Sequence, residues 1–204
     1  MVQTNSTAIY DTLLIAKILV QYNKDFNFSE INLFCYFACL LSLYNGQPLS
    51  YWGYNFIKNE FGVPISAEVQ ISVQRLIELG HLANTSPGYY NITEKGINFL
   101  DTLNYIQRYQ ERRNYIENAC NTLLVNSIGH IRQIINQDPV ISTVKESPLR
   151  VLLNETSGTT ELLYKQFTIL KSAIKCDIDK DLFIVALSWL KCVQNIEEFG
   201  YVYK

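Results

Sequence analysis

The most constraining feature of this chain is a helical stretch that is apolar on almost every side. Residues 29–44 have the sequence SEINLFCYFACLLSLY, with Ser29 placed to cap the start and Asn45-Gly46 placed to stop the end. A helix that is hydrophobic all round has to be enclosed by other elements, so we expect it at the centre of the core. The most apolar stretch of the chain, residues 31–41, is too short to span a bilayer, which needs roughly 20 residues.

Length and charge set further limits. The 204 residues are 48% hydrophobic, which is enough to bury a sizeable core in one large domain or two small ones. The net charge is −2 and the pI is about 5.7, so the whole chain has no general attraction to nucleic acid or acidic membranes. The N-terminal residues lack a secretory signal, and we expect a cytoplasmic protein without a membrane segment.

Shorter elements flank the central helix. Apolar spacing predicts helices over residues 7–22, 51–60 and 66–79, the last capped by Ser66 and stopped by Gly80. Two alternating segments, residues 81–85 and 89–93, predict a β-hairpin. Between them, Ser86-Pro87-Gly88 has proline and glycine in the order that a type II turn prefers. Thr93 can cap the next helix.

That next helix is expected to be long. No proline or glycine occurs over the 32 residues 97–128. A heptad-like seam runs along it, so we expect it to pack on another long helix, from its own C-terminal half or from a second copy. Two more helices are predicted over residues 160–175 and 181–197. We divide the chain into residues 1–103 and 104–204, the second part being a helical extension. The seam consists of Ile106, Tyr109, Arg113, Ile116, Cys120 and Leu123.

Two local sequences resemble the winged-helix domains of the MarR and PadR regulator families. The first is LIELGHL, residues 76–82, where a third helix turns into a strand, and the second is YNITEKG, residues 90–96, where a strand enters a helix. The resemblance covers roughly residues 29–103. It implies a mainly α fold, a winged helix-turn-helix with a small two-stranded hairpin, followed by the long helix and a C-terminal helical region. In such domains the third helix enters the major groove.

The outward side of the predicted third helix is poorly suited to a duplex, because affinity for DNA comes mainly from neutralising phosphates. From residue 29 to residue 100 there are three basic and five acidic residues. The hairpin tip carries no basic residue. An apolar side chain among both signs of charge better suits a protein partner, so we expect an interface at Glu68, Ile71, Arg75 and Glu78. If the chain does bind DNA, the candidate contacts are Lys58, Gln70, Gln74, Arg75 and Asn84.

The basic cluster of the chain lies on the predicted long helix. Arg108, Arg112 and Arg113 alternate there with tyrosines, a combination typical of interface anchors. The alternative is an ordinary solvated face partly neutralised by Glu111 and Glu117. We include the three arginines among the candidate interface residues.

No catalytic, cofactor-binding or metal-binding set is expected. The sequence has no glycine-rich phosphate loop, no HExxH and no GxSxG. Residues 176–181, CDIDKD, resemble the start of a calcium loop but lack its glycine and its final glutamate, so helix capping by Asp179 or Asp181 is favoured. The five cysteines form no CxxC pair and fit reduced, buried thiols. Cys35 and Cys39 are expected to pack in the core.

A second, looser resemblance concerns function. An N-terminal helix, an acidic winged helix with the residues ITEKGINFLDTL (92–103), and Arg- and Tyr-rich residues 109–113 are similar to the small middle component of bacterial three-component ABC-ATPase systems, such as Lamassu-type antiviral systems. The resemblance implies a non-catalytic subunit that binds an SMC-like ATPase and an effector. The alternative is a DNA-binding regulator of the PadR or MarR kind. A homo-oligomer through the long helix is expected in either case.

Overall fold

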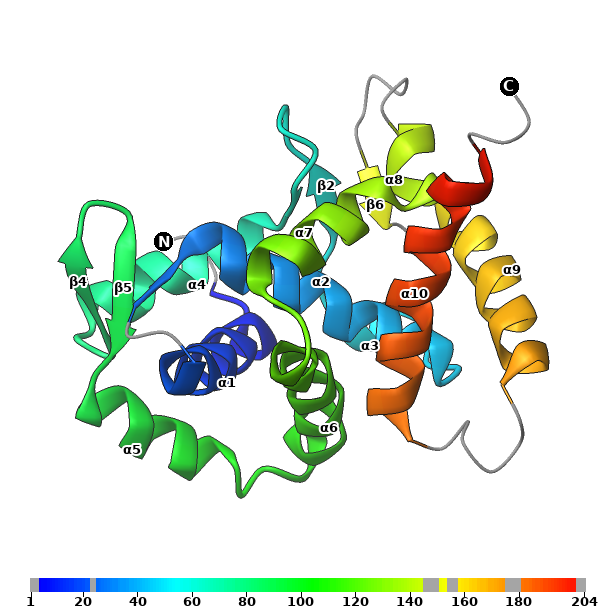
Figure 1. Ribbon diagram of the computed structural model, residues 1–204. Helices are drawn as coiled ribbons and strands as arrows, with labels where there is room; N and C mark the ends of the chain where they lie inside the picture. Colours follow the sequence, from blue (N-terminus) through cyan, green and yellow to red (C-terminus); the bar gives the residue numbers. More distant parts are fainter. Residues whose placement is uncertain (1–3, 23–24, 145–150, 154–157, 175–180, 201–204) are drawn as a thin grey trace.

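The computed structural model describes residues 4–22, 25–144, 151–153, 158–174 and 181–200. Helices dominate, and the strands form two small antiparallel sheets (Figure 1). The mainly α fold with a small β-hairpin is therefore confirmed. The longer helices are α1 (Ser6–Tyr22), α2 (Phe28–Tyr44), α4 (Ala67–Glu78), α5 (Glu94–Leu103), α6 (Gln107–Asn121), α7 (Ile128–Gln137), α9 (Gly158–Ala173) and α10 (Leu182–Gly200).

Helix α2 lies at the centre, as its sequence predicts. Every residue from Ile31 to Tyr44 is buried, and α1, α4, α6, α9 and α10 pack around the helix (Figure 1). Its start differs by two residues from the prediction, because Asn27 and not Ser29 is the cap. The Asn27 side chain accepts from the Glu30 N–H at 3.1 Å, and the Glu30 carboxylate accepts from the Asn27 N–H at 2.9 Å.

The predicted third helix and hairpin are present as α4, β4 (Leu82–Ser86) and β5 (Tyr89–Ile92). The short strand β1 (Phe26–Asn27) adds to β5 and makes a sheet of order β1-β5-β4. Asn84 and Phe26 both lie opposite Tyr90, so these three side chains share one face of the sheet. Val69, Val73 and Leu76 of α4 are buried, as the helical spacing predicts.

Residues 93–96, Thr-Glu-Lys-Gly, follow the hairpin and join the end of α4 to the start of α5 by hydrogen bonds. The Thr93 hydroxyl accepts from the Gly96 N–H at 3.1 Å and lies 2.8 Å from the Gly80 carbonyl oxygen, to which it donates. Lys95 donates to the Leu79 carbonyl at 2.7 Å. A Cβ on Gly96 would lie only 2.2 Å from the His81 carbonyl oxygen, so the close approach requires glycine. The residues that carry the family resemblance therefore have a packing role.

The prediction of a helix over residues 51–60 is wrong. Only one turn forms, α3 (Leu49–Trp52), and β2 (Phe56–Lys58) follows it. Phe56 and Lys58 are buried while Ile57 is exposed, an alternation with the period of a strand. Strand β2 pairs with β3 (Pro64–Ile65) and with β6 (Val151–Leu153), a strand that the sequence did not predict. The second helix that the winged-helix resemblance implies is thus reduced to this single turn.

The prediction of a single long helix over residues 97–128 is also wrong, because the chain turns between α5 and α6. Asn104 caps the end of α5, and its side chain accepts a hydrogen bond from the Tyr10 hydroxyl at 3.1 Å. After this turn α6 packs on α1 and α2 of the same chain (Figure 1). Tyr109, Ile116 and Cys120 of the expected seam are buried there. A homo-oligomer stays a prediction, and it would need a different surface.

The two predicted C-terminal helices are present as α9 and α10. They pack on α2 at the end of the molecule away from the hairpin (Figure 1). Between α6 and α9 lie a short 3-10 helix (Thr122–Leu124), α7 and α8 (Pro139–Thr143). The buried apolar side chains form one cluster that extends from α1 to α10 across residues 103 and 104. The division into residues 1–103 and 104–204 stays a prediction. Among the described residues, no helix is both long and apolar enough to cross a membrane.

Candidate functional site

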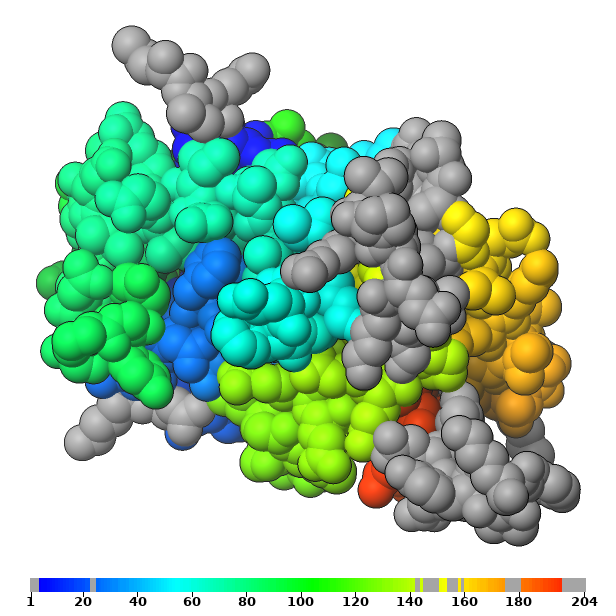
Figure 2. All heavy atoms as spheres, turned by 90° about the horizontal axis from the view of Figure 1, so that it is seen from above, coloured from blue at the N-terminus to red at the C-terminus, as the bar shows by residue number. Residues whose placement is uncertain are grey.

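A groove of about 770 Å³ runs along the outward side of α4. One wall is α4, over residues 70–78, and the other is formed by Thr4, Phe28 and Tyr90 from the start of the chain, α2 and β5. Figure 2 shows α4 and the hairpin at one end of the molecule, with α9 at the other. One side of α4 packs on the core, which leaves the other side of this helix for solvent.

The charges of this groove are already paired with each other. An Arg75 guanidinium nitrogen lies 3.1 Å from a Glu78 carboxylate oxygen, and both side chains are about half exposed. The Gln74 amide lies 3.4 Å from the other Glu78 oxygen, to which it donates. The hydrogen bonds from Arg75 and Gln74 hold the pKa of Glu78 below its usual range. Glu68, at the start of α4, accepts from the Ser66 hydroxyl at 2.8 Å.

The structure therefore brings the four predicted α4 residues to one side of one helix. Ile71, Arg75 and Glu78 line the groove, and Glu68 lies half-buried at the helix start. Sequence reasoning missed three residues of the facing wall, Thr4, Phe28 and Tyr90. They come from distant parts of the chain, and no local pattern indicated that they would meet α4.

The arginines of α6 do not form one surface. Arg108 is exposed, donates to the Ser6 hydroxyl at 2.9 Å and lies over the Tyr109 ring at 4.7 Å from its centre. Arg113 is half exposed and forms an ion pair with Glu117 at 2.7 Å. Neither residue lines the groove of α4. Both remain accessible as candidate contacts for a partner.

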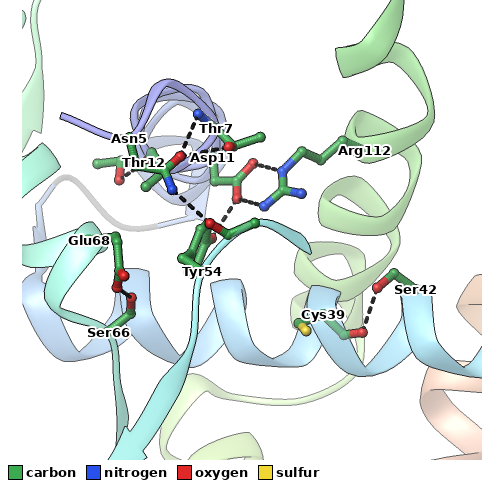
Figure 3. A network of polar contacts seen from close by, with 12 residues as sticks. Asn5, Thr7, Asp11, Thr12, Cys39, Ser42, Tyr54, Ser66, Glu68 and Arg112 are labelled. Atoms are coloured by element: carbon green, nitrogen blue, oxygen red, sulfur yellow. Dashed lines mark hydrogen bonds and ion pairs between the residues drawn. The ribbon is translucent and has the colours of Figure 1, made fainter. Parts of the chain in front are cut away.

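Arg112 is not an interface residue, which corrects the prediction. Its side chain is only 2% exposed and forms a two-pronged ion pair with Asp11 of α1, with both nitrogen–oxygen distances at 2.5 Å (Figure 3). The Tyr54 hydroxyl donates to the same carboxylate at 2.5 Å. Burial opposes the charge of Arg112, but the adjacent Asp11 carboxylate outweighs this effect and raises the pKa of the guanidinium.

A sequence signal for this buried pair did exist. Asp11 lies in the apolar helix α1 and has no exposed surface. A buried carboxylate almost always has a hydrogen-bonding or charged partner, so an aspartate in such a helix predicts a cation elsewhere in the core. The spacing of α6 could not tell which of its arginines would provide the cation.

Lys58 also requires a correction. It is 5% exposed, and its ammonium group donates to the Ile141 carbonyl oxygen at 2.9 Å, so it is not available to a DNA phosphate. The other candidate DNA contacts are exposed. Gln70, Gln74 and Arg75 lie on α4, and Asn84 lies on β4.

Among the described residues, no group of three or more histidine, cysteine or acidic side chains could hold a metal ion. Cys35 and Cys39 are buried in the core, as predicted, whereas Cys192 is exposed. Of the residues that resemble a calcium loop, 176–180 lie outside the described ones. Asp181 caps α10, as predicted, and accepts from the Phe183 N–H at 3.0 Å.

Comparison with known proteins adds no relative. No protein-family model, no curated protein and no solved structure matches this chain. The geometry of the molecule is therefore the basis for a functional proposal.

Proposed function

We propose that this chain is a non-catalytic subunit that binds a protein partner through the groove along α4. The observation that carries this proposal is the Arg75–Glu78 ion pair. Arg75 is the one cation of α4, and an adjacent carboxylate already neutralises it. The same groove offers the apolar side chains of Ile71, Phe28 and Tyr90. Mixed charge around apolar contacts is the surface that protein partners use.

Among the described residues, α4 and the hairpin strands β4 and β5 offer a duplex Arg75 as their one cation. Each phosphate that a protein neutralises needs a lysine or arginine side chain. Lys58 is buried, and the hairpin tip, residues 84–88, has no basic residue. Glu68 and Glu78 lie on the helix that would face the phosphates, and their negative charges would oppose binding. These charges favour a polypeptide over DNA.

The resemblance to the middle component of Lamassu-type systems suggests the class of partner. We propose an SMC-like ATPase as the protein that occupies the groove, within a complex that also holds an effector. The exposed Arg108 and Arg113 on α6 are the proposed second contact. A cytoplasmic location and a role in antiviral defence belong to the same proposal.

A PadR- or MarR-like regulator is the second candidate. The observation in its favour is that Gln70, Gln74 and Asn84 are exposed and carry the amide groups that can read base edges. Titration of duplex oligonucleotides near 150 mM salt, a roughly physiological ionic strength, separates the two candidates. Tight, salt-sensitive binding by the isolated chain would favour the regulator.

The test of the first candidate is co-purification with an ATPase encoded next to this chain. Ile71→Asp places a charge in the groove and is expected to reduce the yield of the complex at least tenfold. The matched control is Ile169→Asp on α9, where isoleucine is 69% exposed and lies outside the groove. Equal yields for the two variants would contradict the proposed site.

A further inference from the structure

One wall of the α4 groove carries a row of hydrogen-bonding side chains. Gln70, Gln74 and Glu78 all line the groove and are four residues apart, so they lie one above the other on the helix. The helical rise of 1.5 Å per residue spaces them by about 6 Å. The apolar Ile71 and Val73 lie on either side of this row.

An extended peptide has a matching repeat. Two residues of a strand advance about 6.6 Å, and every second residue directs its N–H and C=O groups to the same edge. A glutamine amide both donates and accepts hydrogen bonds, so it can pair with either backbone group. Gln70 and Gln74 thus have the spacing and the chemistry to bind alternate residues of an extended segment.

A helical occupant fits less well. The backbone groups of a helix are bonded within the helix, so they could not pair with the row on α4. The Gln70 amide would lose water on binding and gain no partner, which disfavours a helix at this position. An anionic ligand fits poorly too, because Glu78 is in the row and Arg75 is already paired.

We propose that the groove binds an extended, largely uncharged polypeptide segment of the partner, which runs along α4 with apolar side chains at alternate positions. This inference rests on the proposed function and specifies the conformation of the bound segment. One set of alternate side chains contacts Ile71, Phe28 and Tyr90, while the backbone pairs with Gln70 and Gln74.

The probe is a phage-displayed library of random linear 12-residue peptides, selected on the full chain. The expected peptides have apolar residues at every second position and few charges, and their binding is lost in Ile71→Asp. For one selected peptide made synthetically, Gln70→Ala with Gln74→Ala is expected to weaken binding roughly 30-fold, since two hydrogen bonds of about 1 kcal/mol each are lost and 1.4 kcal/mol is about tenfold. The matched control is Gln110→Ala with Gln133→Ala, two exposed glutamines on α6 and α7 outside the groove.

The outcomes separate the two proposals. Peptides that require Ile71 but repeat apolar residues every three or four positions, or that bind equally well without the two glutamines, would overturn the extended conformation and leave the groove as a protein site. Failure to select any peptide, or selection that does not depend on Ile71, would overturn both.

Discussion

The guanidinium carbon of Arg112 lies 3.7 Å from the centre of the Trp52 ring, so this buried cation is held between an aromatic face and the Asp11 carboxylate. The three residues come from α6, α3 and α1, and Tyr54 adds a hydrogen bond from the loop before β2. The contact joins three segments that are far apart in sequence. It holds α6 against α1 after the turn that follows α5.

Removal of Arg112 should destabilise the whole molecule. Arg112→Met leaves the Asp11 charge buried without its partner, and we expect the free energy of unfolding to fall by about 3–5 kcal/mol. Equilibrium unfolding in urea measures this change. Adding Asp11→Leu to the same chain should recover most of the loss, because it removes the orphaned charge. Arg108→Met, at an exposed position, is the control and should change stability by less than about 0.5 kcal/mol. An Arg112→Met protein as stable as this control would contradict the structural role.

Gly96 should tolerate no side chain. In Gly96→Ala the new Cβ would meet the His81 carbonyl oxygen at 2.2 Å and the Ile92 side chain at 2.9 Å. The junction between hairpin and α5 has to shift, and we expect a loss of about 1–3 kcal/mol in thermal or urea unfolding. Gly129→Ala in α7 is the matched control. Apart from its chain neighbours and the backbone of its own helix, no atom lies within 4 Å of the added Cβ there, so stability should rise slightly. Equal effects at the two glycines would argue against the close approach at Gly96.

Asp138 should make stability depend on pH. Burial raises the pKa of this carboxyl to about 6, although the N–H of Val140 donates to it at 2.7 Å. Since the folded state binds the proton more tightly than the unfolded chain, the stabilisation is complete below pH 4 and is lost as the pH rises through about 6. The unfolding free energy of the natural chain, relative to Asp138→Asn, should therefore fall by a few kcal/mol between pH 4 and pH 7.

The asparagine in Asp138→Asn can still accept from Val140 but does not ionise, so the variant should be the more stable protein at pH 7. Asp181→Asn is the control, because the Asp181 carboxylate also accepts from the N–H two residues further along the chain, but at an exposed position. If the natural chain and Asp138→Asn had parallel pH profiles, the shifted carboxyl would be ruled out.

Several elements could be predicted from sequence because their signals are local. The all-round apolar pattern predicts α2 at the centre, and the helical spacing of α4 with the Pro-Gly turn predicts the hairpin. The C-terminal helices α9 and α10 follow from the same reasoning. On α4, the spacing also brought Ile71, Arg75 and Glu78 to one groove.

The errors have non-local causes. Strand β2 pairs with β3 and also with β6, which is almost a hundred residues away, and its three residues are too few for a period to be recognised. The turn after α5 has no proline or glycine, and a hydrogen bond from Tyr10 to Asn104 helps to fix it. Arg112 and Lys58 looked like surface cations because their partners, Asp11 and the Ile141 carbonyl, lie on other elements.

The distance along the chain between Asp11 and Arg112 has a consequence for biosynthesis. Until residue 112 has left the ribosome, the Asp11 carboxylate of α1 lacks the Arg112 guanidinium as its counterion. At about 5–20 residues per second, the hundred intervening residues take roughly 5–20 s to be made. The nascent N-terminal half therefore lacks this ion pair until α6 has been made, and a chain that stops before α6 lacks the guanidinium that completes the pair.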